Sequence, residues 1–225
     1  MKSIPQIVEE QVHRWQIQHK EKPEEKAIVP VVTISREPGS GGRIVAQNLA
    51  ARLGFEVFHQ EVLHEMAKRA EVSEQLLATL DERGLSILED WISSLVHDRH
   101  LWPDQYLQHL LNVIGTLGKH GRAVVVGRGA NFVLPPEQRF RVRITAPQRR
   151  RFKNVAREFK LSPDEAKRRV IKTESNRKAF IRKYFNADIA DPTNYDLVIN
   201  TETLTVDNAV DVIGAALGCL VECEL

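Results

Sequence analysis

The sequence predicts an α/β fold with three layers, in which a five-stranded parallel sheet lies between helices. Five short runs of apolar and β-branched residues are separated by long segments with helical periodicity, and this alternation is typical of βαβ units. One run, 123–126, is apolar throughout, as expected for a strand that is buried on both faces. The first run leads directly into a glycine-rich loop and then an amphipathic helix.

The strands are short and end in polar or glycine-containing segments. We expect them at 31–35, 55–58, 123–126, 140–145 and 197–200. Because ligands of open parallel sheets bind at the carboxyl ends of the strands, the residues that follow each strand are the candidates for a binding site. They include His59 after the second strand and Arg128, between two glycines, after the third.

The helices are expected to fill most of the remaining chain. The helix after the first strand ends at Gly54, a residue suited to the C′ position, and the one that begins at 163 has a start signal in Ser162-Pro163-Asp164-Glu165. A long helical region should be interrupted near Ser73, Gly84 and Pro103. The expected helical segments are 2–20, 44–53, 61–119, 147–160, 163–185 and 206–217.

The length of 225 residues fits one substantial core with a small appendage. We expect an N-terminal helical extension, 1–27, which could pack on the body or pair with a second copy of the chain, followed by one domain, 28–225. No apolar run reaches the roughly 18 residues that a membrane span needs, and no apolar signal core begins the chain. We therefore expect a cytoplasmic protein with no membrane partner. The two cysteines exclude a disulfide framework.

The net charge of +2 conceals a strong asymmetry, because residues 139–183 hold 17 of the 32 Lys and Arg but only 4 of the 30 Asp and Glu. A cationic block on an otherwise acidic protein indicates an anionic ligand, and the alternative is a solvated basic helix face. A nucleic acid is a weaker candidate, because aromatic residues make up only 6% of the chain and those in the block lie at helical spacing.

The glycine loop is the strongest candidate for binding an anion. Gly39, Ser40, Gly41 and Gly42 open a helix, where free backbone amides and the helix dipole favour phosphate. The loop departs from the pattern G-x-x-x-x-G-K-[ST]: Arg36 or Glu37 replaces the first glycine, Gly42 stands in the lysine place, and no Ser or Thr follows. Arg43 is the nearest cation. The alternative is a tight turn that binds nothing.

Four runs together resemble the cytidylate kinase-like branch of the P-loop nucleoside monophosphate kinases. The glycine loop T-I-S-R-E-P-G-S-G-G-R-I-V-A is similar to the form that this branch carries in place of the lysine form. The other runs are V-V-V-G-R-G-A-N at 124–131, V-R-I-T-A-P at 142–147 and D-P-T-N-Y-D-L-V-I-N-T at 191–201. The resemblance spans about residues 29–217.

The resemblance implies a P-loop NTPase-like sheet with a helical acceptor-side insertion at 60–121 and a basic lid at 147–190. It implies transfer of the γ-phosphoryl group of ATP, with Mg²⁺, to a pyrimidine monophosphate such as CMP or dCMP. Such transfer needs positioning and charge neutralisation rather than a covalent nucleophile. The alternative is a nucleotide-binding regulatory protein that has lost turnover.

The same resemblance assigns roles to individual residues. The donor phosphates would be wrapped by Gly39, Ser40, Gly41, Gly42 and Arg43, with Arg36 also facing them and Ser40 as the candidate metal ligand. Arg128 would bind the acceptor phosphate, and His59 stands where the family often has an aspartate near the acceptor. In the lid, Arg177 and Arg182 are the candidates to reach the transferring phosphoryl group.

Overall fold

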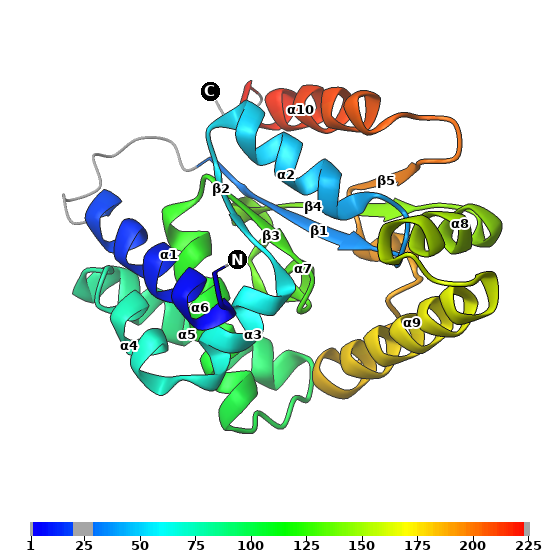
Figure 1. Cartoon of the computed structure of the whole chain (residues 1–225). Helices are drawn as coiled ribbons and strands as arrows, with labels where there is room; N and C mark the ends of the chain where they lie inside the picture. The colour runs from blue at the N-terminus through cyan, green and yellow to red at the C-terminus, as the bar shows by residue number, and fades with distance from the viewer. Residues whose placement is uncertain (1, 20–28, 223–225) are drawn as a thin grey trace.

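The computed structural model describes residues 2–19 and 29–222 and contains the expected parallel sheet. All five strands lie where the sequence places them, and their order in the sheet is β2-β3-β1-β4-β5 (Figure 1). The first strand is therefore central, and its register pairs Ile34 with both Val126 and Val142. The strands are β1 (Val31–Arg36), β2 (Glu56–Phe58), β3 (Ala123–Val126), β4 (Arg139–Thr145) and β5 (Leu197–Asn200).

The helices follow the expected alternation with three differences. The break expected near Ser73 lies at Arg69 instead, because Ser73 is buried inside a helix while Arg69 has extended backbone. A short helix not predicted from the sequence follows Gly129, and the last helix extends to Glu222. The helices are α1 (Ile4–Gln18), α2 (Gly42–Leu53), α3 (Gln60–Lys68), α4 (Ala70–Leu77), α5 (Glu82–Asp98), α6 (Gln105–His120), α7 (Ala130–Val133), α8 (Gln148–Phe159), α9 (Pro163–Phe185) and α10 (Val206–Glu222).

The sheet separates two apolar cores, which confirms the three-layer prediction. Leu49 of α2 and Ile213 of α10 are fully buried against one face of the sheet. Leu63 of α3 and Ile114 of α6 belong to the core on the other face. Figure 1 shows α2 and α10 on one side of the strands and α1 and α3 to α6 on the other. None of the described helices is both long and apolar enough to cross a membrane.

The N-terminal helix α1 packs on the body of the protein. Ser3 caps its first turn, and Val8, Val12 and Trp15 are buried in the same core as α3 and α6. The Trp15 ring meets the Phe58 ring edge-on, with 5.4 Å between centroids. Residues 20–27 of the N-terminal extension expected at 1–27 lie outside the described residues.

Helices α8 and α9 form the part of the protein that extends past the carboxyl ends of the strands (Figure 1). They have a small core of their own, made of Val155, Ala166 and Val170. Ser162 and Glu165 form a capping box at the start of α9, as the sequence signal indicates. Because α8 contributes no buried residue to the two cores of the sheet, polar contacts largely determine how it sits over the glycine loop.

Candidate active site

The glycine loop connects β1 to α2 and is held from several sides. Gly39 and Gly41 both have positive φ values, of 80° and 81°, which favour glycine. A Cβ atom on Gly39 would lie 2.5 Å from the main-chain oxygen of Arg151, so α8 packs directly on the loop. Asn154 of α8 donates a hydrogen bond of 2.8 Å to the carbonyl oxygen of Gly39. Contacts with α8 therefore hold the loop in one conformation.

Backbone amides at the start of α2 remain available for a ligand. The N–H groups of Gly41, Gly42 and Arg43 make no hydrogen bond with the described residues. The Ser40 hydroxyl donates to the carbonyl oxygen of Glu37 at 2.9 Å, which keeps its lone pairs free. Free amides at a helix N-terminus bind anions, and the helix dipole strengthens this binding.

Gly41, Gly42 and Arg43 line a cavity of about 700 Å³, which is called here the donor cavity. Its walls come from the glycine loop, α8, α9 and the segment that follows β5. Six arginines and three glutamates line it, so its charge favours an anion. These charged residues are Arg36, Arg43, Arg150, Arg157, Arg169, Arg177, Glu37, Glu61 and Glu158.

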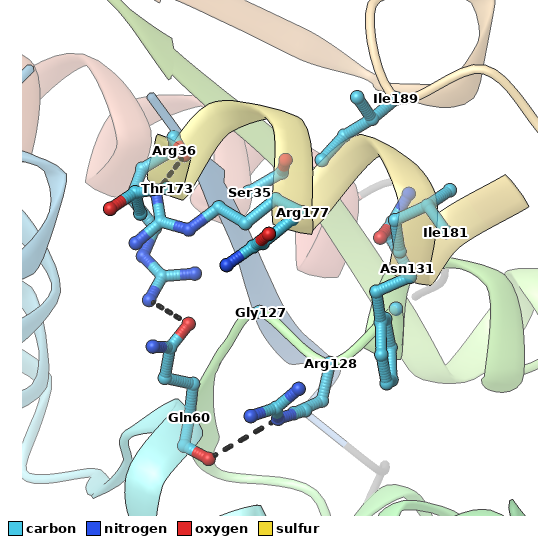
Figure 2. Close-up of a pocket in the computed structure, with 13 residues that line it drawn as sticks. Ser35, Arg36, Gln60, Gly127, Arg128, Asn131, Thr173, Arg177, Ile181 and Ile189 are labelled. Atoms are coloured by element: carbon cyan, nitrogen blue, oxygen red, sulfur yellow. Dashed lines mark hydrogen bonds between the residues drawn. The ribbon is translucent and has the colours of Figure 1, made fainter. Parts of the chain in front are cut away.

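The second cavity, of about 240 Å³, is called here the acceptor cavity and lies between the end of β3 and α9 (Figure 2). Arg36, Arg128 and Arg177 line it, and the residues that line it include no carboxylate. The guanidinium of Arg128 lies 4.9 Å from the centre of the Phe180 ring, and its Nε donates to the main-chain oxygen of Gln60 at 3.5 Å. The charged side chains that line the acceptor cavity thus sum to +3, as they do in the donor cavity, but no carboxylate opposes them.

The two cavities share a wall of four residues: Arg36, Gln60, Thr173 and Arg177. Arg36 donates from Nη2 to the Oε1 atom of Gln60 at 2.7 Å, and Arg177 donates from Nη1 to the carbonyl oxygen of Arg36 at 2.8 Å (Figure 2). An anion in either cavity therefore meets the same two guanidinium groups.

Burial shifts the proton affinity of these guanidinium groups. Loss of solvation and the neighbouring Arg177 charge lower the pKa of Arg36 to about 9. Burial likewise lowers the pKa of Arg177 to about 10. Both groups stay protonated near neutral pH, so the shifts mainly report the cost of burying these cations. A bound phosphate would offset part of that cost.

Glu37 joins the glycine loop to helices α8 and α9. Its Oε2 atom accepts a hydrogen bond of 3.0 Å from the Ala146 amide and lies 3.4 Å from Nε of Arg151. Arg151 is buried and also donates to Glu174 of α9 at 3.0 Å. Arg143 lies 4.0 Å from the other Glu37 oxygen. This network sets the position of α8 and α9 over the donor cavity.

The structure brings most of the residues proposed from the sequence to the two cavities. Arg36 and Arg177 line both cavities, and Arg128 lines the acceptor cavity. The loop residues Gly39, Ser40, Gly41, Gly42 and Arg43 line the donor cavity.

Two of the proposed residues line neither cavity. His59 lies before the first turn of α3, where its Nε2 atom is 3.3 Å from Nε2 of Gln47. Burial, followed by the nearby Arg43 charge, lowers the pKa of His59 to about 4, so its ring is neutral at pH 7. Arg182 is exposed on α9. It follows Arg177 by five residues, which turns its side chain by about 140° around the helix.

Other site residues were given no role from the sequence, although Gln60 and Asn131 stand among the candidates that follow the strands. Gln60 follows the second strand, and that position is its only signal. Glu37 stands in the glycine loop, but nothing local predicts its contact with Arg151. Asn131 is buried beside the acceptor cavity, and its Nδ2 atom has no hydrogen-bond partner among the described residues. Such an unpaired donor can bind an oxygen atom of a ligand.

Comparisons with known proteins agree with the resemblance carried by the four sequence runs. The model of the cytidylate kinase-like family matches residues 31–203. The cytidylate kinase of Ignicoccus hospitalis is 29% identical over 184 residues, which cover 81% of this chain and 96% of that protein. That of Methanopyrus kandleri is 26% identical over 208 residues, covering 88% and 98%. The crystal structure of an uncharacterized protein from Eubacterium ventriosum has a similar fold, with a TM-score of 0.64, 22% identity and coverage of 84% and 98%.

Proposed function

Because the chain belongs to the cytidylate kinase-like family, we propose that it transfers the γ-phosphoryl group of ATP to a pyrimidine nucleoside monophosphate, CMP or dCMP. One observation carries this proposal: two cationic cavities adjoin at a shared wall that contains Arg36 and Arg177. Transfer between two phosphates requires two anion sites that meet at the reacting group. The relatives named cytidylate kinase support the choice of acceptor.

The donor cavity is suited to the polyphosphate of ATP. The free amides of Gly41, Gly42 and Arg43 would hold the donor phosphates, and the Arg43 side chain would add a charge-assisted contact. ATP is accompanied by Mg²⁺, which binds mainly phosphate oxygens and water and so needs few protein ligands. The described residues contain no cluster of three potential ligands, and Ser40 keeps lone pairs for such an ion.

The acceptor cavity is suited to the phosphate of a nucleoside monophosphate. Arg128 is oriented by the Phe180 ring and the Gln60 carbonyl, so its guanidinium is held in place before the substrate binds. Arginine can form two parallel hydrogen bonds with a phosphate. Asn131 has a free donor on the same cavity for another acceptor oxygen.

The reaction then needs only alignment and charge neutralisation. A phosphate oxygen of the acceptor dianion forms a bond to the γ-phosphorus, while the bond from that phosphorus to the β,γ-bridging oxygen breaks. The electron pair of the broken bond stays on the β-phosphate of ADP, and no proton has to move. Arg36 and Arg177 line both cavities and would neutralise the charge of the group in transit.

A second function, nucleotide binding without turnover, is favoured by one observation. The position that holds lysine in the common pattern is Gly42, which supplies no charge. A protein of this kind would keep the donor cavity and use ATP binding as a regulatory signal.

A coupled assay separates the two functions. Purified protein is supplied with ATP, Mg²⁺ and, in turn, CMP, dCMP, UMP and AMP, and formation of ADP is followed together with formation of each diphosphate. We expect turnover with CMP or dCMP to exceed turnover with AMP. ATP binding without diphosphate formation would favour the regulatory function, and failure to bind ATP would contradict both.

A further inference from the structure

The two residues that differ from the common glycine loop, Arg36 and Gly42, lie in contact with each other. When Gly41 is matched to the second glycine of G-x-x-x-x-G-K-[ST], Arg36 takes the place of the first glycine and Gly42 that of the lysine. A Cβ atom on Gly42 would lie 2.6 Å from Cβ of Arg36 and 3.2 Å from Cβ of Ile144. Neither neighbouring atom is the end of a flexible side chain. While position 36 carries a side chain, as it does with Arg36, no side chain fits at position 42 unless the backbone shifts.

The Arg36 side chain runs from this contact to the end of β3. Its Nη1 atom occupies the space that a Cβ atom on Gly127 would need. Its Nη2 atom donates to the amide oxygen of Gln60 at 2.7 Å. The guanidinium thus lies at the shared wall of the two cavities, and its hydrogen-bonded side-chain partner is a neutral amide rather than a carboxylate. A cation placed in this way retains attraction for an anion from either cavity.

We propose that Arg36 replaces the lysine of the common glycine loop: its guanidinium binds the γ-phosphoryl group of ATP during transfer, and position 42 is glycine because Arg36 fills the space. This inference rests on the proposed function and adds to it a specific group for the reacting phosphate. The charge has moved six residues back along the chain, from the first turn of the helix to the end of the strand.

The competing explanation is that Arg36 only supports the fold, by holding Gln60 and through it Arg128. The two explanations differ in what the γ-phosphate contributes to binding. If Arg36 binds that phosphate, its loss weakens ATP binding more than ADP binding. If Arg36 only supports the fold, its loss weakens both equally.

The first experiment measures the dissociation constants of ATP and ADP by calorimetry for the wild type, Arg36→Met, Arg36→Lys and Arg83→Met. Arg83 is exposed on α5 and controls for the loss of one positive charge. We expect Arg36→Met to remove the preference for ATP over ADP, with a loss of about tenfold or more in ATP affinity. Arg36→Lys should keep part of the preference, and Arg83→Met all of it. An unchanged preference in Arg36→Met would overturn the inference.

The second experiment tests whether the side chain at position 36 sterically excludes a side chain at position 42. Gly42→Ala is made in the wild type and in Arg36→Gly, and urea unfolding midpoints are compared. Gly42→Ala should lower the midpoint in the wild type and lower it much less in Arg36→Gly, since the contact with Cβ of residue 36 is gone and only the 3.2 Å contact with Cβ of Ile144 remains. Equal effects in both backgrounds would contradict the steric coupling.

A charge rescue completes the test. Arg36→Gly should reduce kcat by about 10²-fold or more, and adding Gly42→Lys to it should recover at least about tenfold, because lysine then returns to its common position. No recovery would reject the equivalence of Arg36 and the lysine. If the wild type shows no turnover, the proposed function fails, while the ATP and ADP comparison still decides whether Arg36 binds the γ-phosphate.

Discussion

Arg177 donates a hydrogen bond of 2.8 Å to the main-chain oxygen of Arg36, and this contact joins helix α9 to the end of strand β1. The Nε atom of Arg177 is buried and has no hydrogen-bond partner among the described residues. A buried unpaired donor is costly, and a ligand oxygen would satisfy it. Helix α9 thus reaches the sheet through a residue that still has an unpaired donor among the described residues.

Arg177→Met should therefore lower kcat strongly, by about 10²-fold, because it removes a cation at the shared wall of the two cavities. Arg182→Met is the matched control, since Arg182 lies on the same helix but is exposed. Steady-state kinetics with ATP and CMP measure both variants. A loss in Arg182→Met as large as in Arg177→Met would mean that the lid closes further than its position here and brings Arg182 to the substrate.

Arg128 is predicted to act on the acceptor alone. It lines the acceptor cavity and not the donor cavity, so Arg128→Ala should raise the KM for CMP by about tenfold or more while the Kd for ATP stays within about twofold. Kinetics supply the KM, and calorimetry supplies the Kd. Equal loss of both ligands would contradict the separation of the two cavities.

The packing of α8 on the loop can be tested through glycine substitutions. Gly39→Ala meets both a positive φ of 80° and the main-chain oxygen of Arg151, whereas Gly54→Ala meets a positive φ of 65° with no atom within 4 Å. Gly54→Ala should cost about 1–2 kcal/mol of unfolding free energy from backbone strain. Gly39→Ala should cost about 1–3 kcal/mol more from the added clash. Urea unfolding measures the loss of unfolding free energy in both variants. Equal losses would show that α8 can move away from the loop without a measurable loss of stability.

Acid should destabilise the protein through His120, far from the cavities. Burial, followed by the neighbouring His19, lowers the pKa of His120 to about 4. The unfolded chain binds a proton near pH 6.5, so between about pH 6.5 and 4 it holds more protons than the folded protein, and the free energy of unfolding falls as the pH falls.

His120 should contribute about 1–2 kcal/mol to this loss between pH 7 and 5, and His120→Gln should remove that contribution while the one from His59, whose pKa is also lowered to about 4, remains. Unfolding midpoints at both pH values provide the measurement. His13→Gln, at an exposed position of α1, is the control and should leave the pH dependence as in the wild type. An unchanged pH dependence in His120→Gln would show that other groups carry it.

The sheet could be predicted closely because its strands are short runs rich in apolar or β-branched residues. The run at 123–126 is apolar throughout, which already indicates a strand buried on both faces, although the sequence does not say which strands lie beside it. The break between α3 and α4 was misplaced because Ser73, a residue common at helix starts, is used inside a helix, while Arg69 interrupts the helix without any propensity signal.

The site could be predicted from the sequence where the backbone conformation requires a particular residue type. Glycines around Arg128 and in the loop identify places where the chain turns at the end of a strand. Contacts between side chains that are far apart in the sequence cannot be predicted in this way. Arg151 is one of 17 basic residues within 139–183, and only the fold shows that it contacts Glu37. The choice between Arg177 and Arg182 depended on helix rotation relative to the sheet, which local sequence does not encode.

We expect the backbone amides at the start of α2, with Arg43 beside them, to bind the polyphosphate of a nucleotide. Calorimetric titration of ATP with Mg²⁺ into the wild type and Arg43→Ala tests it most directly, with adenosine as the ligand that lacks phosphate. We predict saturable binding of one ATP, a loss of about tenfold in affinity in Arg43→Ala, and far weaker binding of adenosine. ATP affinity that is the same in Arg43→Ala as in the wild type, or adenosine binding as tightly as ATP, would contradict the claim.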